Sequence, residues 1–203
     1  MLERPDDLLG LEREGGRIAA TLGAAARARA RHARRLVLTT SACGACSQTS
    51  VADVVGRFGR LPPEGEPQRF EAARLFRLPA ALRSAQTGFR CTGGLHGAAL
   101  FGPETELPRC VREDVGRHNA LDKVLGRAWL EGWIREPGQL VVVSGRLSYE
   151  LVAKTIALGA PVLAGLGAPS SLAIDLAHRA GITLVGFLRR DRLNVYTHPG
   201  RIR

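Results

Sequence analysis

Two cysteines separated by two residues are the part of this sequence best suited to chemistry. Cys43 and Cys46 follow the apolar run Leu36-Val37-Leu38, which predicts a strand over residues 35–40 that leads into a loop. Alanine, glycine and serine surround both cysteines, so large side chains crowd neither sulfur. Thiols placed in this way can transfer sulfur, exchange disulfides or bind a metal.

Three other uses of cysteine fit this sequence poorly or loosely. A four-thiolate zinc site would need a second close pair, but Cys91 and Cys110 lie far apart and are expected to be ordinary buried or half-buried residues. A zinc deaminase needs His-x-Glu and Pro-Cys-x-x-Cys, and none of the five histidines has a glutamate two positions on. A thioredoxin-like dithiol sits at a helix N-terminus, whereas the next predicted helix starts only at residue 50. No bound metal is therefore expected, and sulfur relay stays one option among several.

The C-terminal half alternates apolar runs with stretches of helical periodicity. Strands are predicted over residues 139–143, 161–164, 182–187 and 194–197, and helices over residues 119–133, 148–158 and 170–180. Strands alternating with helices at this spacing favour right-handed crossovers. The expected fold is therefore α/β, a three-layer sandwich whose mainly parallel or mixed sheet is covered on both faces.

The N-terminal half gives weaker signals. Helices are predicted over residues 50–58 and 79–87, the second closing at Gly88, and the small-residue stretch 92–101 leads into a strand. Near the start, Gly15-Gly16 predicts a turn before a short strand that ends at residue 22. The Ala/Arg run over residues 24–35 has no clean apolar face, so it is interpreted as a solvated connector.

Three segments follow the predicted parallel strands and are expected to meet at one edge of the sheet. They are residues 144–146, 165–171 and 189–192. The first two lead into helix N-termini, whose free N–H groups attract anions, and arginine side chains favour phosphate or carboxylate. The convergence indicates a phosphate-bearing ligand, although glycine-rich turns of this kind also occur for structural reasons alone.

The formal net charge of +10 comes almost wholly from arginine, since only Lys123 and Lys154 are lysines. This charge fits either an anionic partner or a solvated surface. Nucleic acid is not expected, because a single-strand binder needs stacking side chains and aromatic residues are only 5% of the chain. There is no apolar stretch of about 20 residues for membrane insertion and no secretion-signal pattern at the start. Four cysteines with one close pair suit a reducing compartment, so a cytoplasmic location is expected.

Several sequence blocks in order resemble the formate dehydrogenase accessory sulfurtransferase family (FdhD). The resemblance runs from the cysteine loop almost to the end of the chain, and the run Glu-Asp-Val-Gly-Arg-His-Asn from residue 113 is highly specific. The blocks are residues 41–46, 86–96, 113–123, 144–150, 168–173, 187–192 and 195–199.

This resemblance implies a fold similar to that of cytidine deaminases, without their zinc chemistry. It implies that sulfur passes from a cysteine desulfurase to a molybdenum (or tungsten) bis(pterin guanine dinucleotide) cofactor, bound as a substrate, which formate dehydrogenase needs for activity. Cys43 would be the main persulfide carrier and Cys46 its assistant. Cysteine desulfurase, formate dehydrogenase and a second copy of the chain are the implied partners. Residues 1–34 would be a remnant of a longer N-terminal region plus the basic connector, and residues 35–203 the sulfurtransferase domain.

The resemblance also indicates which residues contact the cofactor. The matching segment is Phe187, Leu188, Arg189, Arg190, Asp191 and Arg192. Its arginines would bind phosphates, and Phe187 would either stack on a base or pack in the core. Weaker candidates are Thr92, Gly93, Gly94 and His96, with residues 144–146. Arg117 and His118 are expected to be structural, with Glu113, Asp114 and Asp122 as carboxylate partners. The alternative function is a cofactor- or nucleotide-binding chaperone whose thiols do no chemistry.

Overall fold

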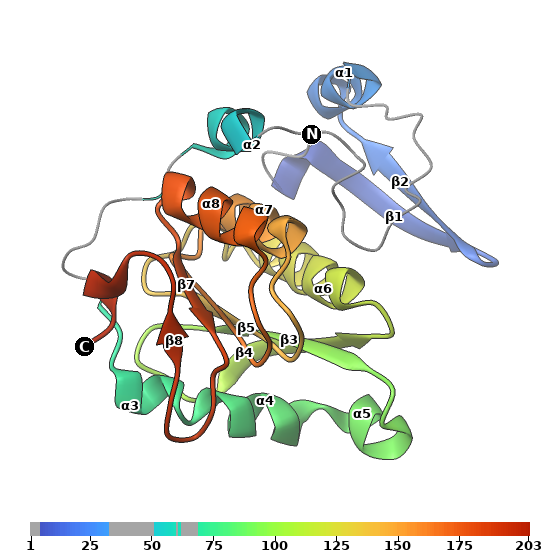
Figure 1. Cartoon of the computed structure of the whole chain (residues 1–203). Coiled ribbons are helices and arrows are strands. Elements are labelled where there is room, and N and C mark those ends of the chain that lie inside the picture. Colours follow the sequence, from blue (N-terminus) through green and yellow to red (C-terminus); the bar gives the residue numbers. More distant parts are fainter. Residues whose placement is uncertain (1–4, 33–50, 60, 62–68) are drawn as a thin grey trace.

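The computed structural model describes residues 5–32, 51–59, 61 and 69–203 of the chain (Figure 1). The strand predicted over residues 35–40 lies outside these ranges, and so do Cys43 and Cys46. The proposed division of the chain near residue 34 falls in the same part of the sequence and stays a prediction.

A six-stranded mixed sheet forms the centre of the described fold, with the strand order β4-β3-β5-β6-β7-β8. The central strands β5, β6 and β7 are parallel, whereas β4, β3 and β8 join antiparallel. The strands are β3 (His96–Phe101), β4 (Pro108–Asp114), β5 (Leu140–Val143), β6 (Val162–Gly165), β7 (Thr183–Gly186) and β8 (Asn194–Val195). The expected α/β class with a mixed sheet is confirmed.

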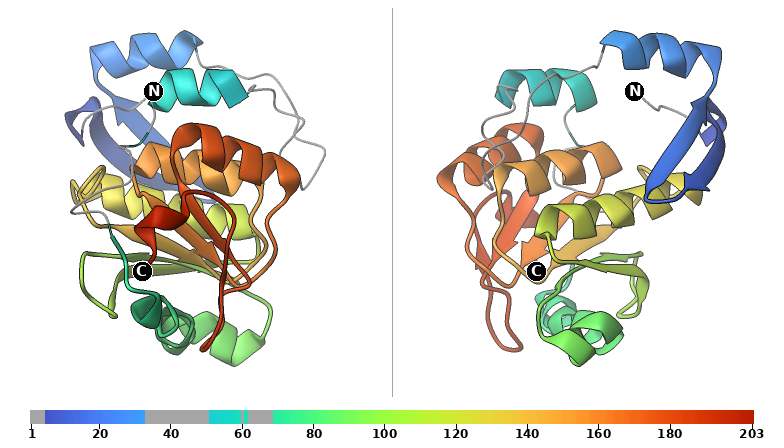
Figure 2. Two further views of the ribbon diagram at one scale, coloured as in Figure 1. Left: turned by 60° about the vertical axis from the view of Figure 1, so that its left-hand side comes forward. Right: turned by 90° about the vertical axis from the view of Figure 1, so that its right-hand side faces the viewer.

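Helices cover both faces of this sheet (Figure 1, Figure 2). One layer holds α2 (Val51–Phe58), α6 (Arg117–Leu130), α7 (Tyr149–Leu158) and α8 (Ser171–Ala180), and the other holds α3 (Ala72–Leu75) and α4 (Leu78–Ala85). Within β5, Val141 and Val143 pack in the first layer's core, and Leu140 and Val142 pack in the second. All four are buried, which explains why the strand is continuously apolar.

The predicted boundaries of α7 and α8 agree with the structure to within one residue. Gly159 and Gly181 follow these helices in the left-handed conformation, with φ of 81° and 79°, which glycine adopts without strain. Ser170 begins α8, and its Oγ accepts a hydrogen bond of 3.2 Å from the N–H of Ala173. Ser148 begins α7, but its Oγ makes no capping bond.

The prediction that a helix closes at Gly88 is wrong. Helix α4 ends at Ala85, and a second helix, α5 (Thr87–Thr92), follows and ends at Gly93 with φ of 67°. Gly88 lies inside α5, and its N–H donates to the Glu113 carboxylate over 2.7 Å. This contact joins α5 to strand β4, so tertiary structure decides the helix end here rather than local propensity.

Near the N-terminus the structure holds more regular elements than predicted. Strand β1 (Leu8–Glu14), preceded by the short 3-10 helix η1 (Pro5–Asp7), pairs antiparallel with β2 (Arg17–Leu22). The predicted connector forms helix α1 (Ala24–His32) because alanine and arginine both favour helices even without an apolar face. Arg29 of α1 pairs with Asp7 at 2.6 Å. No helix among the described residues is long and apolar enough to cross a membrane.

Candidate functional site

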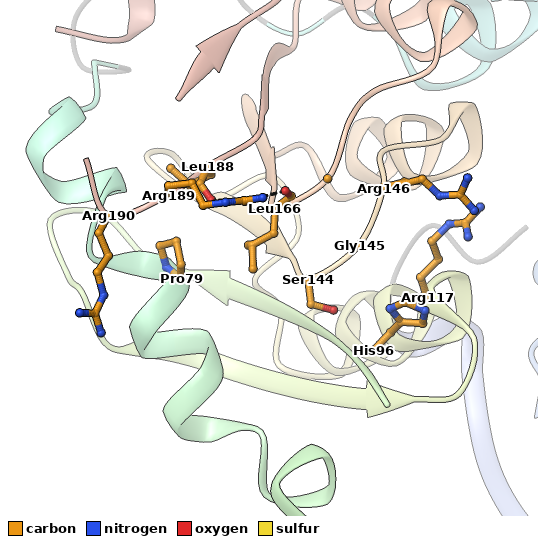
Figure 3. Close-up of a pocket in the computed structure, with 11 residues that line it drawn as sticks. Pro79, His96, Arg117, Ser144, Gly145, Arg146, Leu166, Leu188, Arg189 and Arg190 are labelled. Atoms are coloured by element: carbon orange, nitrogen blue, oxygen red, sulfur yellow. Dashed lines mark hydrogen bonds between the residues drawn. The ribbon is translucent and has the colours of Figure 1, made fainter. Parts of the chain in front are cut away.

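A cavity of about 480 Å³ opens at the carboxyl ends of β5, β6 and β7 (Figure 3). Parts of all three segments predicted to meet at this edge line it, namely residues 144–146, 166–167 and 189–190. The predicted meeting point is therefore confirmed. The lining residues are Pro79, His96, Arg117, Ser144, Gly145, Arg146, Leu166, Gly167, Leu188, Arg189 and Arg190.

A second cavity of about 320 Å³ continues from the first over α4 and α5. Pro79, His96, Ser144 and Leu166 line both cavities, so the two form one cleft. In the second cavity the guanidinium of Arg83 lies 3.8 Å from the ring centre of Phe89, a cation–π contact. The cleft thus combines guanidinium groups, which suit phosphate, with a flat surface that suits a planar ring.

Backbone forms much of the cleft floor. A Cβ atom placed on Gly167 would lie 2.8 Å from the backbone nitrogen and Cα of Arg146 and 2.9 Å from the carbonyl oxygen of Gly145. The Gly167 N–H donates to that same carbonyl over 3.1 Å. Only glycine fits this close approach of two strand-end loops, so Gly167 is required for the shape of the floor.

Arg189 is fixed at the cleft edge by the backbone beneath it. Its Nη1 donates to the carbonyl oxygens of Leu166, over 2.7 Å, and Leu188, over 2.9 Å. Leu188 is itself buried, and its N–H donates to Gly165 over 3.1 Å. These bonds use one nitrogen of a group that has five N–H donors, and they hold a positive charge where a ligand would enter.

Phe187 is 41% exposed, so the core role considered for it is excluded. Its φ of 50° is uncommon for a bulky side chain and stores strain, and its N–H donates to Gly167 over 3.1 Å. Of the six residues in the predicted cofactor segment, Leu188, Arg189 and Arg190 line the cleft. The other three, Phe187, Asp191 and Arg192, are their neighbours in the sequence and are exposed. Their contact with a cofactor stays a prediction.

Most of the weaker candidates also line the cleft. Gly93, Gly94, His96 and residues 144–146 do so, but Thr92 does not. The Thr92 hydroxyl instead donates to the Gly88 carbonyl within α5, over 2.9 Å. Pro79 and Arg83 were not predicted as site residues, because nothing in their helix indicates where that helix lies relative to the sheet.

Arg117, which was expected to be structural, lines the cleft, and its contact with a ligand stays a prediction. The carboxylate of Glu113, one expected partner, accepts hydrogen bonds from the N–H groups of Gly88 and Phe89, each of 2.7 Å. His118 does have a structural setting: its close carboxylate contact is with Glu150, and of the three expected carboxylates Asp122 acts on it through its charge. The specific sequence run over residues 113–119 indicates the family but does not show which of its side chains faces the cleft.

Asp114 anchors the start of α6. Its carboxylate contacts the Lys123 ammonium at 2.5 Å and accepts bonds from the Gly116 N–H, at 2.9 Å, and the Asn119 amide, at 3.1 Å. These donors, Lys123 first, lower the pKa of Asp114 from 3.8 to about 2. The N-terminal turn of α6, which carries Arg117, is thereby held in place.

We expect Asp114→Asn to lower the free energy of unfolding at neutral pH, because the ionised carboxylate is favoured in the folded state. Because the pKa of Asp114 is lower in the folded state, its interactions stabilise the fold fully above pH 3.8, the pKa in the unfolded chain. This stabilisation is lost as the pH falls through about 2. Urea unfolding at several pH values should therefore show a gap between variant and parent that closes towards pH 2. A gap that does not change with pH would contradict this assignment.

The two cysteines that the structure describes differ in environment. Cys110 is buried, and burial raises the pKa of its thiol, which suits an inert residue. Cys91 is exposed, so the expectation that it is buried or half-buried is wrong. It lies on α5, in which no residue is buried. Neither cysteine lines the cleft.

The fold and the cleft define an α/β protein with an arginine-lined site at the ends of its parallel strands. Comparison with known proteins adds the family: the chain matches the FdhD/NarQ family over residues 1–203 and belongs to it. Sulfur carrier protein FdhD from Nocardia farcinica is 48% identical over 169 residues, which are 83% of this chain and 60% of that protein. Its counterpart from Thermoplasma acidophilum is 44% identical over 165 residues, 81% of this chain and 57% of that one. The chain thus spans about three fifths of the length of these relatives.

Solved structures resemble the fold as well. The crystal structure of a protein from Desulfotalea psychrophila, described as a formate dehydrogenase accessory protein, has a TM-score of 0.72 and 25% identity. The match covers all of this chain and 72% of that one. Guanine deaminase from Nitrosomonas europaea has a TM-score of 0.46 and 19% identity over 64% of this chain and 88% of that one.

Proposed function

We propose that this chain is a sulfur carrier that accepts persulfide sulfur from a cysteine desulfurase. It then passes the sulfur to a molybdenum bis(pterin guanine dinucleotide) cofactor, which is its substrate and which formate dehydrogenase needs for activity. The observation that carries the proposal is an arginine-lined cleft in a member of a family whose relatives are named sulfur carrier proteins. The similar crystal structure, described as a formate dehydrogenase accessory protein, supports the link to that enzyme.

The chemistry of the cleft suits this substrate. A pterin guanine dinucleotide carries a pyrophosphate between two planar ring systems. Arg146 and Arg189 offer charge-assisted hydrogen bonds to phosphate oxygens, and the glycine floor lets a ligand approach the backbone closely. The stacked Arg83 and Phe89 offer a planar surface in the second cavity.

The cysteine pair supplies the sulfur chemistry of the proposal. The Cys43 thiolate attacks the terminal sulfur of a persulfide on the desulfurase, a new S–S bond forms, and the desulfurase thiolate leaves. Cys43 then carries the terminal sulfur as its own persulfide. Cys46, three residues on, assists by thiol exchange, which protects the persulfide or helps to release its sulfur.

A second candidate is a chaperone that holds the cofactor without thiol chemistry. The observation behind it is the cleft itself, whose arginines and glycine-rich loops suit a phosphate-bearing ligand whether or not a thiol takes part. The two candidates differ in what they require of Cys43 and Cys46. A carrier needs these thiols, whereas such a chaperone needs only the cleft.

A two-step labelling experiment tests the carrier function. The chain is incubated with a cysteine desulfurase and [³⁵S]cysteine, separated from both, and then mixed with the purified cofactor. We expect the chain to become labelled and to lose the label when the cofactor is added. Replacement of Cys43 and Cys46 should prevent the labelling. Arg189→Ala should load normally but discharge more slowly, because it removes a cleft charge and no thiol. Absence of label on Cys43 and Cys46 would reject the relay.

A further inference from the structure

His118 connects the start of α6 to the start of α7. Its Nε2 lies 2.9 Å from the Ser148 Oγ and 3.3 Å from the Glu150 carboxylate. The Ser148 hydroxyl and the imidazole can each donate or accept in this hydrogen bond. In either direction His118 ties the first turn of one helix to the segment that leads into the next.

The Ser148 side chain contacts His118 and does not cap its own helix. It occupies the N-cap of α7 with extended φ and ψ of −98° and 163°, yet its Oγ caps no backbone N–H. Ser170, in the same position on α8, does cap its helix. The Ser148 hydroxyl thus couples α7 to α6 through His118 rather than closing the end of its own helix.

Both segments that His118 joins carry a cleft arginine. Arg117 precedes His118 on α6, and Arg146 lies two residues before Ser148. Both line the cavity, and Figure 3 shows their guanidinium groups pointing towards the same end of it. A Cβ atom on Gly145 would lie 3.6 Å from the Arg117 Cδ, so the two segments are in close contact. Two positive charges at one end of a cavity repel each other, so holding both there needs a fixed support.

We propose that His118 is a positioning residue that, through Ser148 and Glu150, holds Arg117 and Arg146 together as a paired site for a diphosphate group. The proposal rests on the proposed function in one respect, namely that the cleft takes a phosphate-bearing substrate. It does not depend on any thiol. An anion bound by both guanidinium groups relieves their repulsion, which makes the pair a stronger anion site than either arginine alone.

The charge state of His118 agrees with a positioning role. Burial lowers the pKa of His118, opposed by the nearby Glu150 carboxylate. Arg117 and Lys154 also lower this pKa, and Asp122 raises it. The imidazole is therefore neutral near pH 7 and adds no charge of its own, so its contribution to anion binding comes through the side chains that it positions.

The structure provides a matched control one helical turn away. Lys154 of α7 and Asp122 of α6 form an ion pair of 2.5 Å between the same two helices. Each lies four residues beyond Glu150 and His118, respectively, and neither lines the cavity. Asp122→Asn breaks this pair and loosens the contact between α6 and α7, and because Asp122 raises the pKa of His118, its loss leaves the imidazole neutral and in contact with Ser148.

Calorimetric titration with inorganic pyrophosphate tests the proposal. We expect His118→Leu to weaken binding about tenfold, the effect of one misplaced charge-assisted hydrogen bond. His118→Gln, which keeps a donor near the Nε2 position, should restore most of the affinity, and Asp122→Asn should stay within about twofold of the parent. In an Arg146→Ala background, His118→Leu should cause little further loss, because the pair that it positions is already broken.

Three results would overturn the proposal. They are unchanged affinity in His118→Leu, an equal loss in Asp122→Asn, or a full additional loss in the Arg146→Ala background. Absence of pyrophosphate binding by the unaltered chain would overturn it too. If His118→Leu does not fold, Ser148→Ala takes its place. Ser148→Ala should weaken pyrophosphate binding when Arg146 is present and should cause little further loss when Arg146 is already replaced by alanine. Because pyrophosphate binding involves no sulfur, these outcomes are separate from those of the labelling experiment.

Discussion

Replacing Cys43 and Cys46 together with alanine should reduce the activation of formate dehydrogenase to the level seen without this chain. No other group in the sequence combines the close spacing and uncrowded surroundings that a persulfide relay needs. The measurement is formate oxidation by an enzyme matured in a strain that supplies either the parent chain or the double variant. The effect is expected to be total because the thiols form covalent bonds with the transferred sulfur.

Cys91→Ala is the control for this experiment. Cys91 is exposed and outside the cleft, so its loss should leave activation unchanged. Full activation by the double variant would contradict the carrier function and would favour the chaperone that only binds the cofactor.

Gly167→Ala should have the second largest effect, because the new methyl group has no space. Its carbon would lie 2.8 Å from two backbone atoms of Arg146, and backbone atoms cannot move aside as a flexible side chain can. We expect the free energy of unfolding to fall by about 1–3 kcal/mol, as in other overpacked sites. Displacement of Arg146 should also weaken pyrophosphate binding in calorimetry.

Gly126→Ala is the matched control for Gly167→Ala. Gly126 lies in α6, and a Cβ atom there meets nothing within 4 Å. Alanine favours a helix over glycine by about 0.5–1 kcal/mol, so this variant should be more stable than the parent and bind pyrophosphate equally well. Equal stability and equal pyrophosphate affinity in the two variants would contradict the requirement for glycine at position 167.

Much of the C-terminal half could be predicted because its signals are local. Strand β5 is buried on both faces of the sheet, so its continuous apolar run was enough to identify it. Helices α7 and α8 end at glycines that adopt left-handed conformations, which marks their ends in the sequence. The position of the cleft followed from the same elements, since ligands bind beyond the carboxyl ends of parallel strands.

The elements that could not be predicted depend on contacts distant in sequence. Strand β4 lies at the sheet edge, where Arg109 and Arg112 are tolerated, so its composition does not look like a strand. Arg117 enters the cleft only because α6 starts beside the loop after β5. Arg83 reaches the second cavity because α4 covers the face of the sheet opposite to α6, an arrangement that no local pattern reports.

An intact mass spectrum of the chain after treatment with a cysteine desulfurase and cysteine tests the central claim most directly. Our account predicts one added sulfur atom, lost again on reduction and absent when Cys43 and Cys46 are replaced by alanine. An unchanged mass, or an added sulfur that persists in the double variant, would contradict it.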